Sequence, residues 1–181
     1  MQRWTLFFIG LVLVSGCANL KLESNSDLEL NCENVILDVH TALLEGQQGE
    51  LAKVTRIVDG DTIELADERR VRLIGIDTPE RGDEFYKEAG DSLAELILDK
   101  EVYLTSDITD KDKYGRILRY IFTEDMFVNA EQVKLGWAES YRYEPDIRFI
   151  DLFDCLEMEA QEKELGIWTS AQTFLSRTDI Y

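Results

Sequence analysis

The chain of 181 residues carries 19 basic and 37 acidic side chains, a formal net charge of −18, and 45 % of its residues are hydrophobic. The hydrophobic content and the presence of only two prolines argue against a disordered chain, and the length suits one domain with a sizeable core. The charge alone argues against a nucleic-acid partner, because phosphates are normally bound by a basic surface.

Residues 1–16 are typical of an export signal. Arg3 supplies the early positive charge, and residues 4–14 form an apolar run that is too short to cross a bilayer comfortably. The run ends in Leu13-Val14-Ser15-Gly16-Cys17, which resembles a bacterial lipobox. That resemblance implies cleavage before Cys17 and lipidation of its thiol, and several acyl chains together anchor a protein stably.

We therefore expect an exported, extracytoplasmic protein that is anchored to the cell membrane through Cys17. In a cell with two membranes, Ala18 after the cysteine resembles the type that is sent to the outer membrane. The alternatives are an ordinary signal peptide and an uncleaved anchor.

Residues 17–50 are expected to form a lipidated tether and a small N-terminal extension, with a short helix over residues 31–44. The extension contains Cys32 and the only histidine, His40, which is expected to be a surface or packing residue. Cys32 and Cys155 either form a disulfide or remain as two reduced thiols, and the sequence leaves both alternatives open. A lone histidine outside the domain nearly excludes a Ser/His or Cys/His catalytic site.

Residues 53–76 predict a three-stranded meander. Residues 53–58 and 62–65 are β-prone, and Asp59-Gly60 between them is a strong hairpin signal because glycine accepts a positive φ. A second turn near residues 66–68 leads into a third strand over residues 71–76.

Two carboxylates are placed at the ends of these strands. Asp61 begins the second strand and Asp77 ends the third, so both can lie at one rim of a small barrel. Two carboxylates and a main-chain carbonyl make a hard-oxygen site suited to Ca²⁺. The competing interpretation is that these are turn and loop residues.

The second half of the chain predicts alternating helices and strands. A helix with an apolar face is expected over residues 84–98, strands over 100–106 and 117–122, and further helices over 127–135 and 147–165. Before the strand at 117–122, Gly115 permits a tight turn that would direct Arg116 back toward the carboxylates. Five strands with helices after the third and fifth predict an α+β protein built on an OB-fold barrel.

Three motifs carry a family resemblance. The segments Asp59-Gly60-Asp61-Thr62, Arg72 to Glu80 and Asp112-Lys113-Tyr114-Gly115-Arg116 occur in the order found in the staphylococcal nuclease (thermonuclease) family. The resemblance covers residues 51–168, which we take as the domain, and leaves residues 169–181 as a C-terminal tail. It implies the same five-stranded OB-fold barrel, with about three helices.

The resemblance also implies an activity, namely Ca²⁺-dependent hydrolysis of DNA and RNA to 3′-phosphate products. We expect the protein to be a monomer that prefers single-stranded or denatured substrate. Asp61 and Asp77 would bind Ca²⁺ through their carboxylates and Thr78 through its main-chain oxygen. Glu80 would orient or deprotonate the attacking water. Arg72 and Arg116 would bind the phosphate. The nucleotide would contact Tyr114, Tyr141 and Tyr143, although core packing is a competing role for Tyr141 and Tyr143.

These residue types suit phosphodiester hydrolysis on chemical grounds. The reaction needs positive charge where negative charge develops, and a guanidinium binds two oxygens while staying charged at any working pH. Compared with the family, the loop at residues 81–85 is short and lacks a lysine-rich segment, which weakens the expected substrate groove. The alternatives are a catalytically weak or silent module that binds nucleic acid or protein, and a structural protein on the cell surface.

Overall fold

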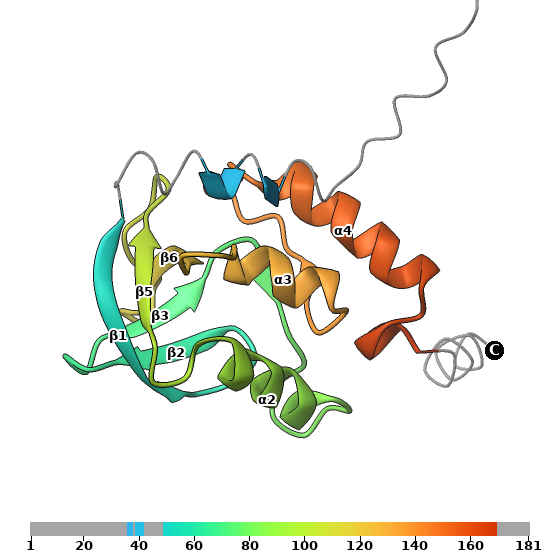
Figure 1. Ribbon diagram of the computed structural model, residues 1–181, viewed down its shortest axis with the longest axis horizontal. Helices are drawn as coiled ribbons and strands as arrows, with labels where there is room; N and C mark the ends of the chain where they lie inside the picture. The colour runs from blue at the N-terminus through green and yellow to red at the C-terminus, as the bar shows by residue number, and fades with distance from the viewer. Residues whose placement is uncertain (1–35, 38, 42–48, 170–181) are drawn as a thin grey trace, which may run out of the picture. The chain divides into compact units, whose positions relative to one another are not determined.

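Five strands close into a barrel in the order β1-β2-β3-β6-β5 (Figure 1). This computed structural model describes residues 36–37, 39–41 and 49–169. All neighbouring barrel strands are antiparallel except β3 and β6, which run parallel. The barrel strands are β1 (Glu50–Ile57), β2 (Thr62–Leu65), β3 (Arg70–Leu73), β5 (Glu101–Thr105) and β6 (Ile117–Phe122).

Within residues 49–169, three α-helices accompany the barrel, and this architecture confirms the predicted OB-type fold. They are α2 (Tyr86–Ile97), α3 (Val128–Lys134) and α4 (Ile150–Glu162), and a 3₁₀ helix follows at Gly166–Trp168. Helix α3 lies between strand β6 and helix α4 (Figure 1). Within the described part of the chain, no helix is long and apolar enough to cross a membrane.

The β1–β2 hairpin forms at Asp59-Gly60 as predicted, but for a different reason. Gly60 does not have a positive φ. A Cβ atom at this position would instead lie 2.8 Å from both the Ala89 Cβ and the Thr78 Oγ1. Glycine is therefore required by the close approach of the turn to helix α2 and to Thr78.

The expected third strand over residues 71–76 is broken in two, which corrects the sequence prediction. Strand β3 ends at Leu73, and β4 (Ile76–Asp77) pairs with β7 (Glu139–Ser140) in a separate two-stranded sheet. Gly75 between them has φ +79°, and a Cβ atom there would lie 2.5 Å from the Phe153 ring. The chain thus leaves the barrel at Gly75, and Asp77 lies on the smaller sheet.

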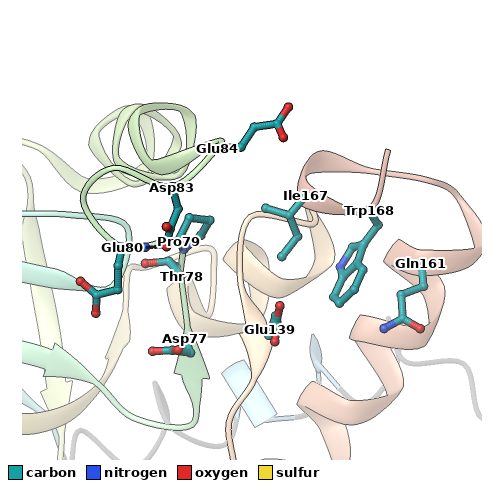
Figure 2. A pocket seen from close by; sticks show the side chains of 10 residues that line it. All are labelled: Asp77, Thr78, Pro79, Glu80, Asp83, Glu84, Glu139, Gln161, Ile167 and Trp168. Atoms are coloured by element: carbon teal, nitrogen blue, oxygen red, sulfur yellow. Dashed lines mark hydrogen bonds between the residues drawn. The ribbon is translucent and has the colours of Figure 1, made fainter. Parts of the chain in front are cut away.

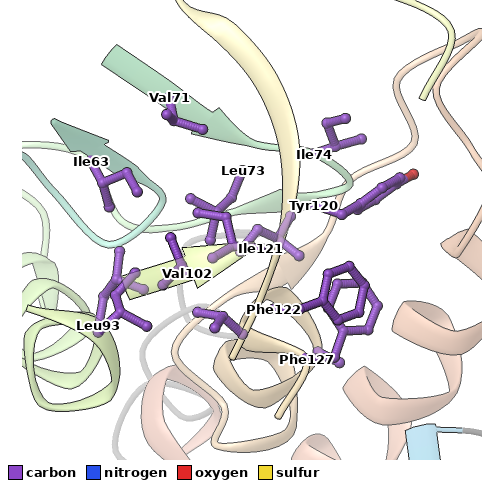
Figure 3. Packing of buried hydrophobic residues seen from close by; sticks show 14 of the residues in the cluster. Ile63, Val71, Leu73, Ile74, Leu93, Val102, Tyr120, Ile121, Phe122 and Phe127 are labelled. Atoms are coloured by element: carbon purple, nitrogen blue, oxygen red, sulfur yellow. The ribbon is translucent and has the colours of Figure 1, made fainter. Parts of the chain in front are cut away.

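The core fills the barrel and continues between the helices (Figure 3). Alternate residues of the strands point inward, among them Ile63, Val71 and Val102. An aromatic cluster follows at the side of α3 and α4, where the Tyr120 and Phe149 rings meet edge to face with centroids 4.6 Å apart. The predicted apolar faces of α2 and α4 are confirmed, since Ala89, Leu93, Ile97, Leu152, Phe153, Leu156 and Ala160 are buried.

Two buried amides on α3 hold the strands beneath the candidate site. Asn129 accepts from the Ile121 N–H and donates to the Ile74 carbonyl, each at 2.9 Å. Gln132 donates to the Gly60 carbonyl at 3.0 Å. These bonds connect α3 to the turns on either side of β2 and β3, so they fix the backbone from which the site residues project.

The part of the N-terminal extension that the structure describes is helical and packs on the domain. His40 is buried, and its Nε2 lies 3.0 Å from the Thr123 carbonyl oxygen, in agreement with the packing role expected for it. Cys155 is disulfide-bonded, and its partner lies outside the described residues, which include neither Cys17 nor Cys32. The predicted signal at 1–16, the lipidation site and nearly all of the predicted tail also lie outside them.

Candidate active site

Arg72 lies at the centre of the candidate site. The antiparallel register of β2 and β3 places it opposite Thr62, next to Asp61. Its Nε lies 3.0 Å from Asp61 Oδ1, and one terminal nitrogen donates to Asp77 Oδ1 at 2.7 Å. The other terminal nitrogen donates to the carbonyls of Leu73 and Ile76, both at 2.7 Å. One guanidinium therefore joins the barrel rim to strand β4.

Asp61 is a buried carboxylate with several donors. Besides Arg72, it accepts from the Thr62 hydroxyl at 3.0 Å and from both the N–H and the hydroxyl of Thr78 at 3.1 Å. Burial raises the pKa of Asp61 to about 6; the nearby charges of Asp59 and Asp77 add to this effect, whereas Arg72 opposes it. Burial therefore disfavours the ionised carboxylate more than its donors and Arg72 stabilise it.

The three predicted metal ligands come together in the structure. Asp61 and Asp77 meet on Arg72, and Thr78 bonds directly to Asp61. Within the described residues, no group of three His, Cys, Asp or Glu side chains could hold a metal ion by itself. The donors present are the carboxylates of Asp61 and Asp77 and the main-chain oxygens beside them, and hard oxygen ligands of this kind suit Ca²⁺. The residues fit a calcium ion on these grounds.

Glu80 follows β4 and is exposed. Its N–H donates to Asp83 Oδ2 at 3.0 Å, and the Asp83 N–H returns a bond to the Glu80 carbonyl at 2.9 Å, so the backbone is held in a tight turn. No group in the described ranges donates to the Glu80 carboxylate itself. That carboxylate is therefore available to accept a proton from water.

Arg116 is directed into the site by the turn that precedes β6. Asp112 accepts from the N–H groups of Tyr114 and Arg116 at 2.9 and 3.0 Å, and from Arg116 Nε at 2.7 Å. Gly115 has φ +84°, which the turn requires. A terminal nitrogen of Arg116 then reaches the Thr62 hydroxyl at 3.3 Å, next to Asp61. The predicted orientation of Arg116 toward the carboxylates is found.

Asp112 is the positioning residue that the site analysis from sequence did not single out. Burial pushes the pKa of its carboxyl upward, but the bonds from Arg116 and from the backbone outweigh this and hold the pKa below its ordinary value. Asp112 therefore stays ionised and keeps Arg116 in place. The signal for it was present, because aspartate at the start of a turn commonly accepts from N–H groups two residues on.

A cavity of about 340 Å³ brings the site residues to the surface; we call it the tyrosine cavity. The Tyr141 and Tyr143 side chains are 47 % and 43 % exposed, and their rings are stacked with centroids 6.4 Å apart. Tyr114 is 73 % exposed, so none of the three is a core residue. The walls of the tyrosine cavity include Arg72, Asp77, Glu80, Arg116, Tyr114, Tyr141 and Tyr143.

A second cavity of about 670 Å³, the acidic cavity, shares Asp77 and Glu80 with the tyrosine cavity; Figure 2 shows its lining residues. Five carboxylates and no basic side chain line it: Asp77, Glu80, Asp83, Glu84 and Glu139. Burial and the charge of Asp77 raise the pKa of Glu139, which faces Asp77 across the β4–β7 pair. Sequence reasoning missed Glu139 because this pairing was not expected.

The chain was compared with known proteins. Residues 70–170 match the family model described as staphylococcal nuclease homologue. A thermonuclease of Staphylococcus intermedius is 36 % identical over 130 residues, which cover 67 % of this chain and 77 % of that protein. An uncharacterized endonuclease of Escherichia coli is 35 % identical over 126 residues, 66 % of this chain and 77 % of the relative. A micrococcal nuclease of Shigella flexneri is 36 % identical over 129 residues, with 65 % and 72 % coverage.

Proposed function

Because the chain belongs to the family of staphylococcal nuclease homologues, it is a hydrolase of phosphodiester bonds, and we propose that it is a Ca²⁺-dependent nuclease. In this proposal it cleaves DNA and RNA to products with a 3′-phosphate. The observation that carries the proposal is the joint presence of two fixed guanidiniums and an unpartnered carboxylate, from Arg72, Arg116 and Glu80, in the tyrosine cavity.

The two arginines supply fixed positive charge to the phosphate. Arg72 is oriented by two carboxylates and two carbonyls, and Arg116 by Asp112. Groups held in this way need little reorganisation when the phosphorus becomes five-coordinate and its oxygens gain negative charge. Their planar donor pairs also match two phosphate oxygens at once.

Glu80 is the group that handles the proton of the attacking water. Its carboxylate is exposed and lines the tyrosine cavity together with both arginines. As the water oxygen bonds to phosphorus, a water proton passes to the Glu80 carboxylate, and the departing oxygen takes up a proton from solvent. When bound by Asp61, Asp77 and the main-chain oxygen of Thr78, Ca²⁺ would add positive charge next to the phosphate.

The substrate is proposed to be single-stranded or denatured nucleic acid. Tyr114, Tyr141 and Tyr143 present exposed rings along the cavity, and aromatic faces stack on bases of any sequence. Unpaired bases reach such rings without the cost of opening a duplex. This supports a nuclease with broad base tolerance.

We propose further that the enzyme is exported as a monomer and anchored to the membrane through lipid on Cys17. The support is the sequence alone, namely the apolar run of residues 4–14 and the lipobox-like ending at Cys17.

The decisive test is cleavage of denatured DNA by the full chain with Ca²⁺ or with a chelator. The unaltered protein should release 3′-phosphate fragments only with Ca²⁺. Glu80→Gln should lower turnover by about 10²–10⁴-fold, because it removes the proton acceptor and leaves an exposed side chain of the same shape. Glu84→Gln, in the neighbouring acidic cavity, is the matched control and should keep its activity.

An unchanged rate in Glu80→Gln would contradict the role of Glu80. If the unaltered chain binds DNA but cleaves none of it with Ca²⁺, the silent binding module is the correct function.

A further inference from the structure

We propose that a third cavity, between the β2–β3 turn and the turn before Arg116, holds the substrate strand beyond the scissile phosphate, with Arg70 as the ligand of the next backbone phosphate. The inference rests on the proposed function and names a binding subsite for it. We call this space the arginine cavity. It has a volume of about 600 Å³ and is lined by Glu68, Arg69, Arg70, Glu80, Tyr114, Gly115 and Arg116.

The arginine cavity adjoins the tyrosine cavity. Both are lined by Glu80, Tyr114 and Arg116, so two of the three catalytic side chains and one tyrosine form a shared boundary. A nucleic-acid strand that places its scissile phosphate at Arg116 has one neighbour on the tyrosine side. In this proposal its other neighbour passes Glu80, which also lines both the arginine cavity and the acidic cavity.

Charge decides between these two exits. The acidic cavity has five carboxylates and no basic residue in its wall. The arginine cavity has two glutamates and three arginines; Arg69 and Arg116 are ion-paired with acidic residues, and Arg70 shares Glu64 with Arg56. In a chain with a net charge of −18, a polyanion is repelled by most of the surface. The backbone phosphates therefore follow the cavity where positive charge is concentrated.

Among the three arginines of this cavity, Arg70 has the least compensated positive charge. Arg69 is already neutralised, since it pairs with both Glu50 and Asp67. Among the described residues, the only ion pair of Arg70 is with Glu64, with Nε 3.5 Å from Oε2, and the same oxygen lies 3.3 Å from Arg56. One carboxylate between two arginines leaves a net positive charge, and the Arg70 side chain is 57 % exposed.

Arg56 provides a matched control. Its side chain is also 57 % exposed and pairs with the same oxygen of Glu64, but it does not line the arginine cavity. Arg70→Gln and Arg56→Gln therefore remove the same charge from the same ion-pair group. Only the first removes a ligand from the proposed subsite.

The experiment compares the kinetics of the two variants on a long and a minimal substrate. For a single-stranded oligonucleotide of ten nucleotides, Arg70→Gln should raise KM about three- to tenfold, with kcat almost unchanged. Above about 0.1 M salt, the slope of log KM against log salt should also fall by about 0.7, the value for one lost phosphate contact in a single strand. For the p-nitrophenyl phosphodiester of one nucleotide, which has no further phosphate, both parameters should stay unchanged.

On the oligonucleotide, Arg56→Gln should raise KM less than Arg70→Gln does, because it leaves Glu64 to Arg70 alone but keeps Arg70 in the subsite. On the minimal substrate it should match the unaltered protein. Equal effects of the two variants would overturn the subsite, because they would show a general effect of surface charge. An unchanged KM in Arg70→Gln would overturn it as well.

A binding measurement separates this inference from the proposed catalysis. Fluorescence anisotropy with the same labelled oligonucleotide needs no turnover. If the unaltered chain fails to cleave but Arg70→Gln still weakens binding relative to Arg56→Gln, the subsite stands and the catalytic proposal fails. If the unaltered chain cleaves and binding does not depend on Arg70, the subsite alone is wrong.

Discussion

At the scale of single residues, the geometry of Arg72 leads to a prediction about its substitution. Its guanidinium satisfies Asp61, Asp77 and two carbonyl oxygens at the same time. A lysine ammonium is a point charge that cannot reach all four acceptors in one plane. We expect Arg72→Lys to lower kcat by about 10²–10³-fold, the effect typical of a lost transition-state donor.

The same substitution should lower the melting temperature, because the buried Asp61 carboxylate loses part of the ion pairing that compensates its charge. Arg119→Lys is the control, since Arg119 also bonds an aspartate but lies outside both the tyrosine and the arginine cavities. Turnover assays and thermal unfolding measure the two effects. Full activity in Arg72→Lys would show that positive charge alone suffices at this position.

At the scale of elements, the break between β3 and β4 depends on Gly75. Its φ of +79° and the Phe153 ring 2.5 Å from a hypothetical Cβ exclude any side chain. Gly75→Ala should lower the free energy of unfolding by about 2–4 kcal/mol through backbone strain and overpacking. Gly82→Ala is the control, since Gly82 has φ +107° with nothing within 4 Å and should lose only about 1 kcal/mol. Equal losses in urea unfolding would rule out the clash with Phe153.

Helix α4 carries a glutamate whose ionisation opposes folding. Burial, together with the charges of Glu139 and Asp154, raises the pKa of Glu157. The folded state therefore binds the proton more tightly than the unfolded chain, so this contribution to stability is complete below the ordinary pKa and is lost as the pH rises through the folded value.

Glu157→Gln should consequently raise the melting temperature at pH 7, and the gain should vanish near pH 4. The bond from the Gln161 amide to Glu157 can be kept, because the new side chain retains a carbonyl oxygen. Exposed Glu162→Gln on the same helix is the control, with a smaller gain expected. A gain that grows toward acidic pH would contradict the assigned sign.

The parts of the fold that could be predicted depend on residues close together in the sequence, whereas the parts that could not be predicted depend on residues far apart. The barrel strands, the three helices and the closeness of Asp61, Arg72 and Asp77 followed from alternation, helical spacing and nearby motifs. The break at Gly75 did not, because its cause is a ring 78 residues later in the chain, on α4. The β4–β7 pair and the acidic cavity depend on that break, so they were missed with it.

At the scale of the whole molecule, the net charge of −18 opposes substrate binding at long range, while the arginines attract phosphate at short range. The Debye length falls from about 30 Å at 0.01 M salt to about 8 Å at 0.15 M. We expect kcat/KM for a single-stranded oligonucleotide, at fixed Ca²⁺, to rise with salt up to about 0.1 M as the repulsion is screened. It should fall at higher salt as the local contacts weaken. A steady fall from the lowest salt would show that the local arginines dominate at all distances.

The parallel pairing of β3 with β6 has a consequence for the timing of activity during synthesis. Val71 pairs with Ile117, and Asp77 pairs with Glu139, although Asp61, Arg72, Asp77 and Glu80 all lie within twenty residues of one another in the sequence. A ribosome has thus made most of the catalytic side chains long before it makes the strands that hold them. A nascent or prematurely terminated chain that ends before β6 carries the reactive groups without the barrel, so its site is not assembled.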